Sequence, residues 1–445
     1  MSTTNEVSKF VLDMNFDFLH DDVIHAGKKA FINYLAVSIY SSKDPSLKIM
    51  TDLFAENTDK QLASIIGKNI KTNLENATLA NGYLGHLEDF DDTHFPTIIH
   101  PSSPTFPSAL ALAESLEKSG KDFLLASILG IEICCRIGLA MHPSHYDQGW
   151  HITGTTGVFG SAIASAILLD LDNLQLKNCL GIAGTQAAGV REVFGTMSKP
   201  FHAGRSAQSG LLAAKLADKG FTSAINIFEG RRGFFDVLAP EYDLSILTRN
   251  LGSDWEIFQN GLKPYACGVV NHPLIDAMIR LKNENQFDTD NIKSIKAYVH
   301  YLVPELVGHK QHPAIGLEGK FSFHHSMAVG LLYGRATPLE YTDTIVKDPS
   351  VEKLRNIIEC EIREDFDEEH AIVEITYTDN TSVKVEIENC SGSPNNPLTD
   401  KQLIDKFNIL VQGVLGEQRT EELLSTLWNL EELDNIASIF PMMHP

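Results

Sequence analysis

The spacing of apolar residues changes near residue 263, and this change constrains the fold more than any other feature of the sequence. Before it, apolar residues recur every three to four positions, as in LHDDVIHAGKKAFINYLAVSIY at residues 19–40, which predicts helices. After it, AIVEITYTDNTSVKVEIEN at residues 371–389 alternates apolar and polar side chains around a central Asp-Asn pair, which predicts a β-hairpin. From residue 400 the helical spacing returns.

We therefore expect a mainly α protein with two parts. A large all-α helical domain, residues 1–262 plus 400–445, holds an inserted smaller α+β lid domain, residues 263–399. Within the insert, SIKAYVHYLV (294–303) is typical of a strand and FSFHHSMAVGLLYG (321–334) of a helix. A cleft between two such domains is a usual place for a small-molecule site.

Small side chains mark the expected centre of the helical domain. Residues 157–169 and 206–217 are rich in Gly, Ala and Ser, which lets helices approach each other closely. Residues 107–117 open with a proline, which suits the first turn of a helix, so we expect a helix to begin there. The most apolar stretch, 123–141, contains Glu132 and Arg136 four positions apart, which favours a buried helix over a membrane span.

The overall charge excludes some partners. The formal net charge of -22 argues against nucleic acid and against anionic membrane surfaces, although a local cationic cluster can still bind a small anion. The six cysteines form no CxxC pair, which favours reduced thiols. No leader pattern opens the sequence, and we expect a cytoplasmic protein.

Titratable side chains gather in four segments. HLEDFDDTHFPTIIHPSSP (86–104) holds three histidines and four carboxylates. GWHITGTTGVFGSA (149–162) places a histidine beside a Gly/Thr stretch, which we expect to be a loop running into a helix. GTMSKPFHAGRSAQSG (195–210) concentrates cationic side chains in an acidic protein, and GLKPYACGVVNHPLIDA (261–277) brings a lysine to the domain junction.

Each segment also has a purely structural interpretation. The aspartates of DFDDT can cap a helix or bond a turn, and His151 can be a hydrogen-bonded core histidine. Lys199 and Lys263 can be solvated loop lysines. Of the adjacent His324 and His325 on the predicted helix, one can be exposed and the other buried.

A metal site is another interpretation of residues 86–104. Histidine and carboxylate side chains are ligands for zinc and for hard cations. Their spacing here is not a specific ligand pattern, and the sequence has neither an HExxH motif nor paired cysteines. We therefore expect no metal.

The four segments, taken together and in this order, resemble the MmgE/PrpD family. The resemblance spans about residues 20–440, and the combination of its motifs is specific although each motif alone is weak. The matching stretches are DFDDT (89–93), HPS (100–102), HITGTTGVFGSA (151–162), SKPFHAG (198–204), LKPY (262–265), HPLIDA (272–277) and GKFSFHH (319–325).

The resemblance implies a homodimeric enzyme without an organic cofactor or redox metal, whose active cleft lies between the helical domain and the lid. The family acts on small di- or tricarboxylates such as 2-methylcitrate, cis-aconitate and iminodisuccinate. Imidazoles can move a proton near neutral pH, and ammonium groups can hold carboxylates. The site residues it implies are Asp89, His100 and His151 as catalytic and Thr93, Lys199 and Lys263 as substrate-binding.

Three positions differ from what the resemblance leads us to expect. His94 stands where a tryptophan usually follows DFDDT, Gly268 where the animal decarboxylase has a histidine, and His325 where the dehydratase often has a tyrosine. We expect all three to affect substrate discrimination.

The first hypothesis is a lyase, either a dehydratase or a decarboxylase, that acts on a small polycarboxylate. The alternative is an isomerase or epimerase that removes and returns a proton next to a carboxylate. A ligand-binding protein without catalysis and a metal-dependent hydrolase are the remaining alternatives. A screen of small carboxylates would separate these classes by their products.

Overall fold

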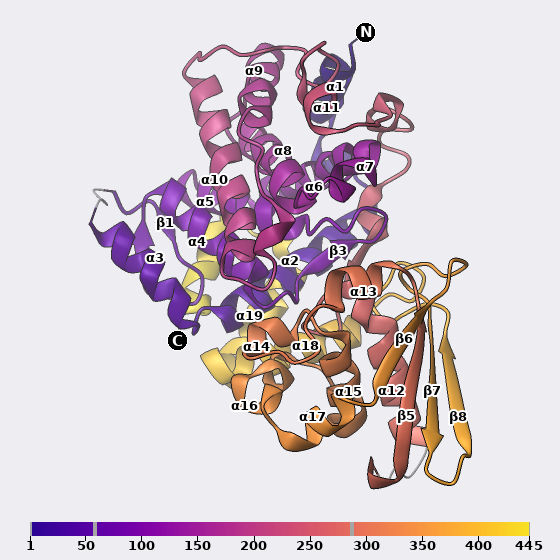
Figure 1. Ribbon diagram of the computed structural model, residues 1–445. Helices are drawn as coiled ribbons and strands as arrows, with labels where there is room; N and C mark the ends of the chain where they lie inside the picture. The colour runs from indigo at the N-terminus through magenta and orange to yellow at the C-terminus, as the bar shows by residue number, and fades with distance from the viewer. Residues whose placement is uncertain (1, 57–59, 285–288, 445) are drawn as a thin grey trace.

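The computed structural model describes residues 2–56, 60–284 and 289–444. It is mainly helical, and Figure 1 shows the helices of the first half above a smaller part that holds the one larger sheet drawn. The helices of the first half are α1 (Thr3–Asp13), α2 (Asp21–Ser41), α3 (Pro45–Ala55), α4 (Leu74–Leu87), α5 (Ser102–Ser115), α6 (Gly120–Met141), α7 (Ser144–Asp147), α8 (Ile152–Leu168), α9 (Asn173–Gly184), α10 (Ser198–Asp218) and α11 (Phe234–Leu238).

Helix α8 is the centre of the helical part, because α5, α6, α9 and α10 all pack against it. Its small residues permit this. A Cβ on Gly157 would lie 2.6 Å from the Pro104 side chain, and one on Gly210 of α10 would lie 2.5 Å from the backbone of Ala162. The predicted close approach of small-residue helices is thus confirmed.

Helix α6 is a core helix. Among the described residues it alone is long and apolar enough to cross a membrane, yet 89% of its most apolar window is buried inside the protein. Glu132 accepts a hydrogen bond from Arg136 at 2.6 Å, and the Arg136 guanidinium also donates to three backbone carbonyls. The predicted buried helix is confirmed, and its two charged side chains form an ion pair.

The inserted part is built around a four-stranded sheet in the order β6-β5-β7-β8. Strand β5 (Ile292–Val299) pairs in parallel with β6 (Ile358–Ile362) and antiparallel with β7 (Ala371–Tyr377), which forms the predicted hairpin with β8 (Ser382–Ile387). The strand expected at 294–303 ends early, because Leu302 begins helix α13. The remaining helices of this part are α12 (His272–Glu284), α13 (Leu302–Val307), α14 (Gly316–Gly319), α15 (Phe323–Tyr333), α16 (Asp343–Val346) and α17 (Pro349–Arg355).

The chain then returns to the first helices. Helix α18 (Asp400–Leu415), capped by Thr399, packs against α2, and α19 (Glu417–Trp428) follows it (Figure 1). The Lys406 ammonium of α18 donates to the Asn33 side chain of α2 at 2.7 Å. The fold is therefore a helical domain with a smaller α+β part, as predicted, while boundaries at 262/263 and 399/400 stay a prediction.

Two local predictions are wrong. Helix α5 does not begin at Pro107 but at Ser102, and Pro107 lies inside it. The Ser102 and Ser103 hydroxyls donate to Asp92 and Asp91, and these tertiary bonds hold the earlier start. The Gly/Thr stretch after His151 is not a loop, because α8 already begins at Ile152.

Candidate active site

Five of the six predicted site residues line one cavity. Asp89, His100, His151 and Lys199 come from the helical half, and Lys263 comes from the chain entering the inserted part. The cavity holds about 40 Å³, room for roughly three water molecules. Small-molecule sites are usually several times larger.

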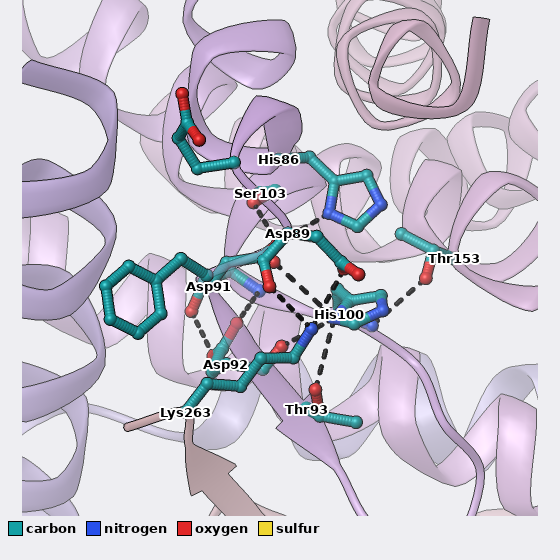
Figure 2. Close-up of polar contacts among 12 residues, drawn as sticks. His86, Asp89, Asp91, Asp92, Thr93, His100, Ser103, Thr153 and Lys263 are labelled. Atoms are coloured by element: carbon teal, nitrogen blue, oxygen red, sulfur yellow. Dashed lines mark hydrogen bonds and ion pairs between the residues drawn. The ribbon is translucent and has the colours of Figure 1, made fainter. Parts of the chain in front are cut away.

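Asp89 is the electrostatic centre of the cavity. Its Oδ1 accepts a hydrogen bond from Lys199 Nζ at 2.8 Å and another from Lys263 Nζ at 2.9 Å. Lys263 Nζ also donates to the Asp89 carbonyl at 3.0 Å, and Figure 2 shows this lysine reaching toward the aspartate. Asp89 has a left-handed φ of 51°, and its Oδ2 is buried without a hydrogen-bond partner among the described residues.

Burial and charge pull the ionisation of these groups in different directions. Burial raises the pKa of Asp89, but the Lys199 and Lys263 ammonium groups outweigh it and hold the pKa well below its usual value. Burial lowers the pKa of Lys199, and the Asp89 carboxylate opposes this shift only in part. The Asp89 carboxylate is therefore already paired with the Lys199 and Lys263 ammonium groups. A substrate carboxylate that enters the cavity can compete with Asp89 for these two lysines.

His100 is held with one ring nitrogen fixed. Its Nδ1 lies 2.7 Å from the Asp92 carbonyl, which can only accept, so Nδ1 carries the proton. Its backbone N–H donates to Thr153 Oγ1 at 3.0 Å (Figure 2). Burial and the Lys263 ammonium lower the pKa of His100 well below its ordinary value. The ring is thus neutral at pH 7, with an unshared electron pair on Nε2.

Thr93 does not line the cavity. It lies on the short strand β3 (Asp92–His94), which pairs with β4 (Asn260–Leu262) and is fully buried. Its hydroxyl is 3.2 Å from His100 Nδ1, the nitrogen that is already bonded to a carbonyl. The structure therefore places Thr93 against the imidazole, where it can orient the ring, and gives it no direct contact with the cavity.

A second layer of polar groups supports His100. Asp91 Oδ2 accepts hydrogen bonds from His86 Nδ1 at 2.8 Å and from Ser103 Oγ at 2.7 Å, and its other oxygen lies 3.6 Å from His100 Nδ1 (Figure 2). The His86 and His100 rings pack with centroids 4.6 Å apart. Burial raises the pKa of Asp92 to about 7, with a further rise from the charge of Asp91.

Four of these side chains have the composition of a metal site. His86, Asp89, Asp91 and His100 each offer a ligand atom, all within 4.8 Å of one another and all buried. However, two ammonium groups already neutralise Asp89, and a dication would repel both. We keep the expectation of metal-independent chemistry as a prediction.

His151 immediately precedes α8, and its imidazole is paired with another imidazole. Its Nδ1 lies 2.9 Å from Nδ1 of His202 on α10, and its backbone N–H donates to the Gly189 carbonyl at 3.0 Å. Burial and the nearby Lys199 ammonium lower the pKa of His151 well below its ordinary value, and burial lowers that of His202 to about 4. The sequence showed His202 near Lys199, but no spacing rule pairs it with His151.

Aromatic and aliphatic side chains that sequence reasoning missed close the cavity. The Lys199 ammonium lies 5.5 Å from the ring centre of Phe194 and 5.3 Å from that of Phe321. The other residues of the lining that were missed are Ile98, Tyr146, Val269, Val270, Leu306 and Val307. None has a sequence signal, because the lining comes from the tertiary packing of separate short helices and loops.

Several structural interpretations are wrong. Lys199 and Lys263 are buried, not solvated, and His324 and His325 are both buried. His325 bonds the Glu340 carbonyl at 3.0 Å, which places it outside the cavity lining.

Of the three positions expected to affect discrimination, Gly268 alone is in the lining. His94 is also outside it, because it is bonded to Thr97 and Glu256 at 2.7 and 3.1 Å. His94 and His325 therefore do not line the cavity, and their effect on substrate discrimination stays a prediction.

This arrangement can bind a small anion and move a proton beside it. Two ammonium groups can hold a carboxylate and stabilise charge that develops next to it. The free Nε2 of His100 can accept a proton, and His151 offers a second imidazole in the same cavity. All of these groups are buried, so their interactions are only weakly screened.

Comparison with known proteins identifies the family of this chain. The MmgE/PrpD N-terminal domain model matches residues 5–247, and the MmgE/PrpD C-terminal domain model matches residues 265–431. Cis-aconitate decarboxylase of Aspergillus terreus is 24% identical over 99% of this chain and 96% of its own.

Two further relatives match less of their own length. The cis-aconitate decarboxylase of Homo sapiens is 24% identical over 99% of this chain and 94% of its own. The mitochondrial 2-methylcitrate dehydratase of Yarrowia lipolytica is 26% identical over 68% of this chain and 62% of its own. The chain therefore belongs to the MmgE/PrpD family and is a lyase-type enzyme.

Proposed function

We propose that this enzyme is a cofactor-independent lyase that decarboxylates or dehydrates a small di- or tricarboxylate by proton transfer next to a carboxylate. One observation carries the proposal: the paired ammonium groups of Lys199 and Lys263 and the imidazoles of His100 and His151 line the same buried cavity. The names of the relatives, decarboxylase and dehydratase, support this reaction class.

In this mechanism the substrate carboxylate displaces part of the Asp89 interaction and binds the two lysines. Their charge stabilises the electron pair that forms beside the carboxylate when carbon dioxide leaves or a proton is removed. His100 serves as the proton acceptor, because its Nδ1 keeps the proton on the side of the Asp92 carbonyl. A dehydration then needs a donor for the departing hydroxyl, and a decarboxylation needs one for the carbanion. In this proposal His151 supplies that proton.

Substitution of each histidine tests the proposal. His100→Gln and His151→Gln should each lower turnover by about 10²–10⁴-fold, the usual contribution of a general acid or base, while unfolding remains cooperative. His25→Gln is a matched control, because His25 lies on α2 and bonds Asp400 outside the cavity. Full activity in both cavity variants would refute the assignment.

The presence of two imidazoles in one cavity also supports a second candidate, an epimerase that acts on a small dicarboxylate such as iminodisuccinate. One imidazole would remove the proton and the other would return it to the opposite face. In D₂O an epimerase incorporates deuterium without net loss of substrate, whereas a lyase forms carbon dioxide or a new double bond. A homodimeric state and a cytoplasmic location remain predictions.

A further inference from the structure

The two parts of the protein contribute different kinds of side chain to the cavity lining. The titratable groups, with the exception of Lys263, all come from the helical half. Apart from that lysine, the inserted part contributes only Gly268, Val269, Val270, Leu306, Val307 and Phe321. None of these side chains carries a charge or a hydrogen-bond donor, so a carboxylate placed against this wall would lose its hydration without compensation.

The charged groups of the lining can compensate few carboxylates. Lys199 and Lys263 supply two positive charges, and Asp89 removes one of them, while the two neutral imidazoles add none. Behind this layer, Asp91 adds a negative charge, and Lys406, whose pKa burial lowers well below its usual value, offsets it by at most one positive charge. A bound tricarboxylate would therefore leave at least two uncompensated negative charges, and each costs several kcal/mol when buried.

Gly268 is a lining position of the inserted part whose backbone and surroundings would admit a polar side chain. Its φ of -56° and ψ of 133° suit any residue. A Cβ there would meet only the Val307 side chain at 3.4 Å and the Asn271 side-chain nitrogen at 4.0 Å, both ordinary contacts. Nothing in the backbone thus requires glycine, and the absence of a side chain leaves that end of the cavity both open and uncharged.

From this division we infer that the substrate is a small dicarboxylate whose third substituent is an alkyl group packed against the inserted part, and not a tricarboxylate. The inference rests on the proposed function and names its substrate class. In this proposal two carboxylates converge on Lys199 and Lys263, and the alkyl group faces Val269 and Val307.

A matched pair of ligands tests it. Citraconate and cis-aconitate share the same cis-dicarboxylate core, with a methyl group in the first where the second has a carboxymethyl group. Calorimetric titration of the full-length protein should show citraconate bound at least about tenfold more tightly, because the third carboxylate loses its hydration against the apolar wall. Gly268→Lys should reverse this preference, whereas Gly268→Met, of similar length but uncharged, should keep it.

Equal or tighter binding of cis-aconitate to the unmodified protein would overturn the inference and leave the proposed function standing. So would a preference for citraconate that Gly268→Lys does not weaken. If Lys199→Met leaves the binding of both ligands unchanged, the anion site itself is wrong, and the proposed function fails with the inference.

The contact between His151 and His202 carries a second inference independently. Two ring nitrogens 2.9 Å apart share one proton, so the direction of that hydrogen bond decides which nitrogen of His151 is protonated. Gly189 makes the contact possible, because it has a φ of 127° and a Cβ on it would lie 3.1 Å from His202 Nδ1. The backbone is thus shaped to admit the second imidazole.

We propose that His202 is a positioning residue whose Nδ1–H donates to His151 and keeps the His151 proton on Nε2. His151 is then the proton donor, which complements His100 as the acceptor. The reverse direction would give the cavity two acceptors and no imidazole donor. This inference also rests on the proposed function.

Two isosteric substitutions separate the directions. The amide of His202→Asn can donate to His151 Nδ1, whereas the carboxylate of His202→Asp can only accept. We expect the Asn variant to keep kcat within about tenfold and the Asp variant to lose about 10²-fold or more, with the His151 limb of the pH–rate profile moved upward. Equal kcat in the two variants, or a more active Asp variant, would overturn the proposal, and unchanged KM would show that substrate binding is intact.

Discussion

Replacement of Asp89 by asparagine removes the one anion between two buried ammonium groups. Lys199 and Lys263 donate to the same oxygen at 2.8 and 2.9 Å, and both lysines are at most 5% exposed. At an effective dielectric constant of 20 the gross attraction of the two pairs is about 12 kcal/mol, and desolvation offsets most of it. Loss of one partner from a buried pair costs about 3–5 kcal/mol, and we expect Asp89→Asn to destabilise the protein by that amount.

The backbone should contribute little to this loss, because asparagine tolerates the left-handed conformation that Asp89 adopts. Urea unfolding at pH 7 measures the effect. Asp52→Asn is the matched control: Asp52 also pairs with a lysine, Lys48, but on the surface of α3, and it should change stability by less than about 0.5 kcal/mol.

The variant should also show a distinctive pH dependence. Burial already lowers the pKa of Lys199, and removal of Asp89 lowers it further. A lysine whose folded pKa lies below its unfolded value binds fewer protons in the folded state, so stability rises with pH across that window. The free energy of unfolding of Asp89→Asn should therefore approach that of the unmodified protein as the pH rises from 7 to 10. A loss below about 1 kcal/mol, or a difference that does not narrow, would refute the electrostatic account.

Three further predictions follow from the same structure. Because burial and nearby ammonium groups lower the pKa of His100 and His151, the acid limb of kcat/KM should be centred below about pH 6.5, and a limb at or above that value would contradict their assignment. Arg136→Met should lower the free energy of unfolding in urea by about 3–5 kcal/mol, because it leaves the buried Glu132 carboxylate without its partner. The loss should be smaller at pH 5.5 than at pH 8, since burial raises the pKa of Glu132 to about 7. An equal loss at both pH values would contradict this. A chelator should leave turnover unchanged, and a loss restored by one added cation would instead favour a metal at His86 and Asp91.

The sequence predicted the layout of the fold because its signals are local. The alternation at 371–389 reports a half-buried hairpin, and the spacing at 19–40 reports an amphipathic helix. Pro107 misled the prediction, because a favourable position for proline at a helix start was overridden by the hydroxyl bonds of Ser102 and Ser103. Nor does the apolar run 294–303 contain any signal that the strand ends at Val299.

The site could be predicted only through motifs. Asp89, His100, His151, Lys199 and Lys263 stand in motifs that the family resemblance singled out, and they meet in one cavity. Thr93 is in the same motif but lies against His100, because strand pairing points it there.

The apolar lining residues of the inserted part, by contrast, come from separate segments that meet only in the folded protein. Val307 and Phe321 therefore carry no signal of their own. The same is true of the bond between His151 and His202, whose side chains are 51 positions apart.

The central claim is that this cavity makes a hydrogen or a carboxyl group beside a carboxylate labile. Proton NMR in D₂O tests it most directly, with citraconate, cis-aconitate, citrate, methylcitrate and iminodisuccinate offered in turn to the unmodified protein and to His100→Gln. We predict that at least one acid is converted with solvent deuterium at the carbon next to a carboxylate, and that His100→Gln slows this conversion by about 10²-fold or more. Equal rates in the two proteins, or no exchange and no conversion of any of these acids, would contradict the account.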